Sequence, residues 1–140
     1  MLIGTYRHSI DAKKRMRIPS KFKCELGTNC IITKGTGTNL MVFSKDGFDK
    51  LYEKLSNVSI FDEEAQKPVR KFLSSAFEAE EDAQGRILLP KELAKHAEIT
   101  KNIVFVGLGN RVEIWAEEVW DKTQETDEKP DFSILAKLGV

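Results

Sequence analysis

Asp11-Ala12-Lys13-Lys14-Arg15-Met16-Arg17-Ile18-Pro19 has a second version later in the chain, Asp82-Ala83-Gln84-Gly85-Arg86-Ile87-Leu88-Leu89-Pro90. Both stretches follow the spacing Asp-x-x-x-Arg-x-x-x-Pro. Later landmarks repeat too, because Phe43 and Trp115 close similar apolar runs. Asp82 follows Asp11 by 71 residues and Trp115 follows Phe43 by 72, so one inserted residue accounts for the difference. A repeat this regular indicates a structural duplication.

The duplication predicts how the two copies pack. Two similar units in one chain most simply pack about a pseudo-two-fold axis, which places equivalent residues side by side on one surface. Arg15 and Arg86 are then expected to form a pair.

Each copy has the pattern of a strand, a turn, a strand, a short helix, a hairpin and a helix. Alternating apolar residues predict the strands, and Pro19 and Pro90 end the second strand of each copy because proline cannot donate a ladder hydrogen bond. Gly and Asn residues suit the turns of the later hairpins, and Ser44 is the expected N-cap of a helix. The elements are expected at residues 5–10, 16–18, 31–43 and 44–55 in the first copy, and at 76–80, 87–89, 91–97, 103–115 and 117–120 in the second.

A connecting helix is predicted between the copies, over residues 62–75. Pro68 falls inside it, and since an interior proline removes a backbone hydrogen bond, we place the regular part of the helix after Pro68. Residues 123–140 begin polar and end in an apolar spacing that predicts a short docking helix. Its apolar face needs a partner, either the body of the protein or another subunit. The predicted division of this α+β chain is a first unit at 1–56, a connecting helix at 57–75, a second unit at 76–122 and a tail at 123–140.

Length and composition favour a cytoplasmic protein with a core of its own. At 140 residues the chain is long enough for one independently folded domain. Cys24 and Cys30 are the only cysteines and no secretory leader pattern opens the chain, so we expect two free thiols. No apolar run approaches the roughly 20 residues that cross a bilayer, so no membrane partner is expected.

The charge distribution indicates a polyanion partner even though the formal net charge is zero. Residues 1–23 contain seven basic side chains and one acidic side chain, Asp11. Most of the compensating acidic residues lie after residue 77. Such an asymmetry allows one basic face on a neutral molecule. Six of these side chains are candidate phosphate contacts, which would fix the register of a duplex without reading its sequence: Arg7, Lys13, Lys14, Arg17, Lys21 and Lys23.

The two Asp-x-x-x-Arg turns are the sharpest candidate site. A carboxylate four residues before an arginine can cap the backbone N–H groups of the turn and hold the guanidinium in a fixed orientation. A fixed guanidinium suits bidentate contact with guanine O6 and N7. We therefore predict that Arg15 and Arg86 read bases and that Asp11 and Asp82 orient them. A structural ion pair that only staples the turn is the alternative, and it has about equal weight for the two aspartates.

Catalysis and metal binding have little support in the sequence. His8 and His96 have no nucleophile at a meaningful spacing, and Cys24 and Cys30 lack the companions of a zinc site. We expect no enzyme activity, no metal and no cofactor.

Long motifs in both copies resemble the MraZ family of bacterial regulators, built from two AbrB-like swapped-hairpin units. In the second copy they are residues 82–90, residues 106–115 and Trp120; in the first they are residues 11–15 with Pro19 and Phe22. The family usually has Gly before the arginine of the turn, as at Gly85, whereas this chain has Lys14 in the first turn. If that position needs a positive φ, Lys14 is strained there.

The resemblance implies a fold and a function. It implies two tandem AbrB-like swapped-hairpin units with pseudo-two-fold symmetry and short flanking helices. It also implies a nucleoid-associated, sequence-specific transcriptional regulator of the division and cell-wall gene cluster, which binds short tandem promoter repeats as a ring-shaped homo-oligomer, with an octamer as one candidate size. Arg15 and Arg86 carry over as candidate readers. The alternative is an antitoxin-like protein-interaction module that uses the apolar tail to hold another protein.

Overall fold

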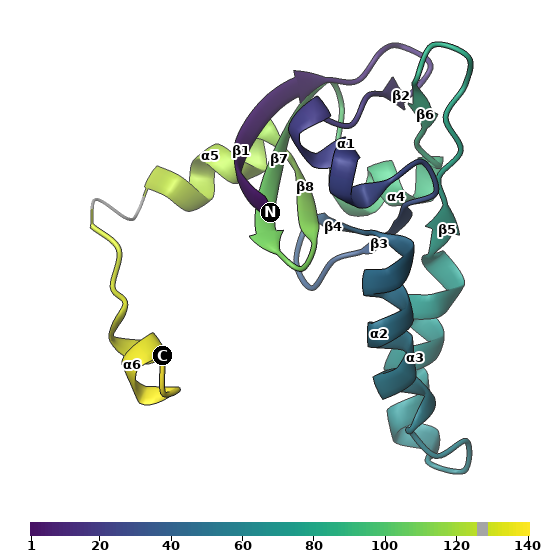
Figure 1. Ribbon diagram of the computed structural model, residues 1–140, viewed down its shortest axis with the longest axis vertical. Helices are drawn as coiled ribbons and strands as arrows, with labels where there is room; N and C mark the ends of the chain where they lie inside the picture. The colour runs from purple at the N-terminus through teal and green to yellow at the C-terminus, as the bar shows by residue number, and fades with distance from the viewer. Residues whose placement is uncertain (126–128) are drawn as a thin grey trace.

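The computed structural model describes residues 1–125 and 129–140, and it confirms an α+β fold. A six-stranded antiparallel sheet has the order β1-β7-β8-β4-β3-β5, and β2 and β6 form a separate two-stranded ribbon (Figure 1). The elements are β1 (Leu2–Ser9), β2 (Arg15–Met16), α1 (Ser20–Leu26), β3 (Ile31–Lys34), β4 (Leu40–Phe43), α2 (Lys45–Ser56), α3 (Glu63–Ser75), β5 (Phe77–Glu78), β6 (Ile87–Leu88), α4 (Lys91–His96), β7 (Asn102–Gly109), β8 (Val112–Ala116), α5 (Glu117–Glu125) and α6 (Ser133–Lys137).

The two copies exchange their first strands. β1 of the first copy pairs with β7 of the second, and β5 of the second copy pairs with β3 of the first. β4 and β8, which are equivalent strands, pair at the centre of the sheet. In the ribbon, Met16 lies opposite its own equivalent, Ile87. This pairing scheme is that of a pseudo-two-fold axis through the centre of the sheet and the ribbon.

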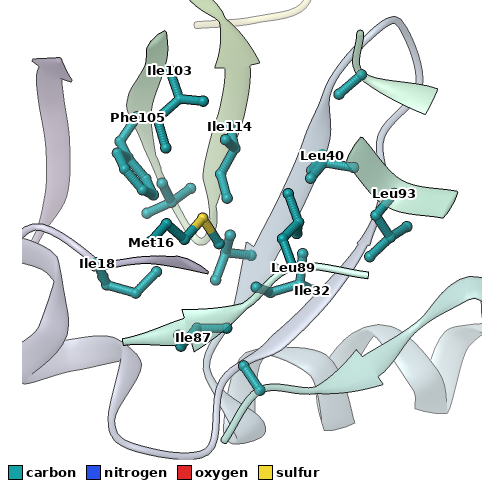
Figure 2. Packing of buried hydrophobic residues seen from close by; sticks show 14 of the residues in the cluster. Met16, Ile18, Ile32, Leu40, Ile87, Leu89, Leu93, Ile103, Phe105 and Ile114 are labelled. Atoms are coloured by element: carbon teal, nitrogen blue, oxygen red, sulfur yellow. The ribbon is translucent and has the colours of Figure 1, made fainter. Parts of the chain in front are cut away.

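The hydrophobic core lies between the ribbon and the sheet (Figure 2). Alternation along β2 and β6 turns Met16 and Ile87 inward, and Met16 lies near Phe105 and Ile114 of the sheet. Phe22 of α1 is fully buried and meets Tyr6 edge-to-face, with ring centroids 5.0 Å apart. Because the ribbon contributes core residues from both copies, its two turns are held in a fixed relation to each other.

α2 and α3 lie beside each other and extend away from the sheet (Figure 1). Ser44 caps α2 as predicted, because its hydroxyl accepts a hydrogen bond from the Gly47 N–H at 3.0 Å. The expectation that the regular part of the connecting helix follows Pro68 is wrong. α3 begins at Glu63, five residues earlier, because Asp62 caps it by accepting from the Ala65 N–H at 3.1 Å. The helix therefore continues through Pro68.

The tail forms the short helix α6, which lies apart from the sheet in Figure 1. Its apolar side chains are exposed. Among the described residues, no helix has the length and apolar character needed to cross a membrane.

Candidate nucleic-acid interface

The two Asp-x-x-x-Arg turns have the same hydrogen-bonding geometry. Asp11 Oδ1 accepts from the backbone N–H groups of Lys13 and Arg15, both at 2.9 Å, while its Oδ2 accepts from Arg15 Nε at 2.8 Å. In the second copy, Asp82 Oδ1 accepts from the N–H groups of Gln84 and Arg86, both at 2.9 Å, and its Oδ2 accepts from Arg86 Nε at 3.0 Å. Each carboxylate therefore caps its turn and also restricts the orientation of a guanidinium.

The ribbon brings the two arginines together. β2 and β6 are antiparallel, and Arg86 Nη1 lies 4.0 Å from Asp11 Oδ2, so the carboxylate of the first turn faces the guanidinium of the second. Arg15, Arg86 and Asp11 line one surface depression of about 520 Å³. The side chains of Arg15 and Arg86 keep 29% and 24% of their surface exposed, which leaves their free N–H groups available to a ligand. The expected pairing of the arginines on one exterior surface is confirmed.

The hydrogen bonds of the turns lower the pKa of both carboxyl groups. The backbone N–H of Arg15 is the largest cause at Asp11, and the backbone N–H of Arg86 is the largest cause at Asp82, because both stabilise the charged form. A carboxyl group with a lowered pKa stabilises the fold fully above its unfolded-state pKa. That stabilisation is lost as pH falls through the folded-state pKa.

We therefore expect the melting temperature to fall as pH drops below about 4, the ordinary pKa of aspartate. An Asp11→Asn/Asp82→Asn variant keeps a carbonyl oxygen that accepts from the turn N–H groups but has no proton to gain. Its melting temperature should therefore depend less on pH between 5 and 3, by scanning calorimetry. Parallel curves for the two proteins would contradict this reasoning.

Lys14 has a positive φ of 62°, at the position where the second turn has Gly85 with φ 75°. A side chain in this left-handed region costs roughly 1–2 kcal/mol, whereas glycine adopts it freely. The strain predicted for Lys14 is thus present in the first turn. The lysine is partly exposed beside Arg15, where it adds a positive charge.

Lys14→Gly is expected to raise the free energy of unfolding by up to about 1 kcal/mol, because the relief of strain exceeds the entropic cost of glycine. If Lys14 also contacts a phosphate, the same variant should bind DNA less tightly, with a salt dependence reduced by about one charge. Urea unfolding and fluorescence anisotropy measure the two effects. Lys14→Asn, which tolerates positive φ but carries no charge, separates strain from charge.

The structure divides the remaining candidate phosphate contacts into two groups. Lys13, Arg17 and Lys21 are exposed, and Arg17 Nε also donates to the Gln84 carbonyl at 3.2 Å, which ties the first strand of the ribbon to the second turn. Arg7 and Lys23 are paired with acids instead. Arg7 contacts Asp121 at 2.8 Å and Glu117 at 3.2 Å on α5, and Lys23 contacts Glu81 at 3.0 Å. The structure does not bring Arg7 to the two turns.

Leu88 is an interface candidate that the sequence reasoning missed. It lies opposite Arg15 in the ribbon and is 61% exposed, between the buried residues Ile87 and Leu89. Strand alternation could have revealed it, because Leu88 is the equivalent of Arg17 and both point outward. An apolar side chain beside an arginine can contact a thymine methyl group in the major groove.

The histidines take structural positions. His8 lines the depression and meets Phe105 edge-to-face, with ring centroids 5.4 Å apart. The His96 ring lies 2.9 Å from the Gly37 carbonyl. Over residues 1–125 and 129–140, no three His, Cys, Asp or Glu side chains gather as they would around a metal ion.

Comparison with known proteins identifies the family. The family model described as "MraZ protein, putative antitoxin-like" matches residues 1–71 and 72–137. A protein named transcriptional regulator MraZ from Caldanaerobacter subterraneus subsp. tengcongensis is 44% identical over 128 residues, which cover 91% of this chain and 90% of that protein. Proteins of the same name from Alkaliphilus oremlandii and Clostridium acetobutylicum are 40% and 42% identical, with all of each chain covered. The chain, with its two copies of the capped turn, belongs to the MraZ family.

Proposed function

We propose that this protein is a sequence-specific transcriptional regulator that binds double-stranded promoter DNA with the β2–β6 ribbon. One observation carries the proposal: Arg15 and Arg86, each oriented by its own aspartate, lie side by side on one exposed surface. Relatives that align over the whole chain are named transcriptional regulators, which supports the same role.

The ribbon suits the major groove, which admits a two-stranded β-ribbon. Arg15 and Arg86 are the proposed base readers, and each good bidentate contact with guanine discriminates by about 1–3 kcal/mol. Lys13, Lys14, Lys21 and Arg17 are the proposed phosphate contacts. Arg17 also holds the second turn, because its Nε donates to the Gln84 carbonyl. The basic first turn binds the backbone more strongly than the second, whose matching positions are Gln84 and Gly85.

Self-association completes the proposal. A chain with zero net charge binds a polyanion weakly on its own. Linking several such units raises the overall affinity by about 10²–10⁴-fold without any new contact. We therefore propose a homo-oligomer, with the ring that the family resemblance implies, bound to short tandem repeats. The proposed target is the promoter of the division and cell-wall gene cluster, which places the protein on the nucleoid.

A footprint on the DNA upstream of the protein's own gene, at two salt concentrations, tests this proposal. We expect protected blocks at a regular spacing at low salt, and partial loss of protection at high salt because counterions compete for the phosphates. A shuffled sequence of the same composition is the control and should show no protected blocks. Equal, unpatterned protection of both DNAs would show a non-specific binder, and the absence of protection at low salt would refute DNA binding.

An antitoxin-like interaction module is the second candidate function. The exposed apolar residues of α6 favour it, because such a face binds another protein surface. Deleting residues 130–140 separates the two candidates: loss of a captured protein with DNA binding intact would favour the interaction module.

A further inference from the structure

The tail ends in an apolar surface that the rest of the chain leaves uncovered. Phe132, Ile134, Leu135 and Leu138 are 65%, 63%, 44% and 71% exposed. α6 is only five residues long and has no side-chain cap, so a helix this short has little stability without packing. These observations indicate that α6 is a segment that docks on another surface.

An open apolar groove lies between α2, β4 and the turn that joins β7 to β8. Its volume is about 670 Å³. Leu51 and Leu55 of α2 and Phe72 of α3 form one wall, and Met41 and Phe43 of β4 line the groove as well. A groove of this size and character accommodates a few large apolar side chains of a short helix.

The charges around the groove and along the tail are complementary. Lys50, Lys54 and Arg111 lie at the groove against Glu25 and Asp46, an excess of one positive charge. Arg111 Nε is buried and has no hydrogen-bond partner within the part of the chain that the structure describes. The sequence from 125 to 140 is acidic, with four carboxylates against two lysines: Glu125, Asp127, Glu128 and Asp131 against Lys129 and Lys137. A carboxylate of the tail would offer a further acceptor to the Arg111 guanidinium, whose Nη1 already donates to Asn110 Oδ1.

We propose that α6 of one copy of this protein docks in the groove of the next copy. Within the described residues of a single chain both surfaces are left open, and in the proposed assembly the tail of each copy covers the groove of its neighbour. The contact joins two different surfaces, so it is head-to-tail, and repetition of it closes into a ring when the rotation between neighbours permits. The inference rests on the self-association in the proposed function and names the surfaces that produce it.

Paired variants test the contact in the full-length protein. Leu135→Asp/Leu138→Asp disables the tail, and Leu55→Asp disables the groove by placing a charge of the tail's own sign in its wall. The controls carry the same charge beside the contact: Ser133→Asp/Ala136→Asp in the tail, and Tyr52→Asp on α2, which is 49% exposed and does not line the groove. By light scattering, both disabled variants should be single chains at concentrations where wild type and controls are assembled.

Mixing the two disabled variants gives a sharper result. The groove variant retains an intact tail and the tail variant retains an intact groove, so a mixture should form a pair with one working contact and stop at two chains. A tail that binds its own groove would leave the mixture at one chain and would overturn the inference. Disabled variants that remain as large as wild type would overturn it as well.

DNA binding separates this inference from the proposed function. On a duplex with a single repeat, the disabled variants should bind as wild type does, because the ribbon is unchanged. On a duplex with several repeats, their affinity should be lower by about a hundredfold or more, because linkage is lost. A wild type that binds neither duplex would refute the proposed function, whereas full affinity of the disabled variants for several repeats would refute only the role of the tail.

Discussion

Replacing both Arg15 and Arg86 by alanine is expected to reduce the affinity for promoter repeats by at least about 30-fold, to that for unrelated DNA. Two bidentate contacts with guanine are worth roughly 2–6 kcal/mol together. The fold should survive, because each aspartate still accepts two backbone N–H groups of its turn after the guanidinium is removed. Fluorescence anisotropy with repeat and shuffled duplexes measures the loss, and circular dichroism checks the fold.

Two controls show whether these side chains read bases or only supply charge. Arg15→Lys/Arg86→Lys keeps both charges but removes the fork, so it should retain binding to shuffled DNA and lose preference for the repeats. Arg17→Ala should weaken binding to both duplexes alike and reduce the salt dependence by about one charge. A promoter shift as strong as that of wild type from the double alanine variant would refute the assignment.

Gly107→Ala is expected to cost about 3 kcal/mol or more of unfolding free energy, at the upper end of overpacking effects. A methyl group at Gly107 would lie 2.6 Å from the Ile3 nitrogen and 2.6 Å from the Leu2 carbonyl carbon. Both are backbone atoms of β1, which cannot turn aside as a side chain can. The variant should therefore push β1 away from β7 and weaken one of the two exchanged pairings between the copies.

Urea unfolding measures this cost, and hydrogen exchange locates it. The amides of β1 and β7 should exchange faster in the variant, whereas those of β3 and β5 should change least. Gly37→Ala is the matched control, because no atom lies within 4 Å of the added methyl group there and φ is not positive. Equal stability of the two variants would show that β1 adapts to the added methyl group.

Much of the fold follows from short-range patterns in the sequence. The repeat of Asp11, Arg15 and Pro19 in the second copy indicates the duplication, and strand alternation places Met16 inside and Arg17 outside, as observed. The exchange of first strands between the copies came from the family resemblance. A local pattern cannot show it, because β1 and β5 have the same character whichever copy they pair with.

The departures from prediction come from contacts distant in sequence or from a cap. Arg7 belongs by sequence to the basic cluster, yet it contacts Asp121, 114 residues later, because the exchanged β1 passes beside α5. The cap of Asp62 lets α3 begin before Pro68, although the sequence placed its regular part after the proline. The boundaries at residues 56, 75 and 122, and the base-reading roles of Arg15 and Arg86, remain predictions.

If the ribbon binds DNA as proposed, fusion of the two exchanged units into one chain has a consequence for the sites that it selects. A dimer of identical units must present the same turn twice and favours inverted, palindromic half-sites. Here Lys13 and Lys14 of the first turn correspond to Gln84 and Gly85 of the second, so the two ends of the ribbon differ in charge. An asymmetric ribbon would bind each site in one orientation only. Successive copies joined head-to-tail would therefore favour direct repeats, in which every site has the same orientation.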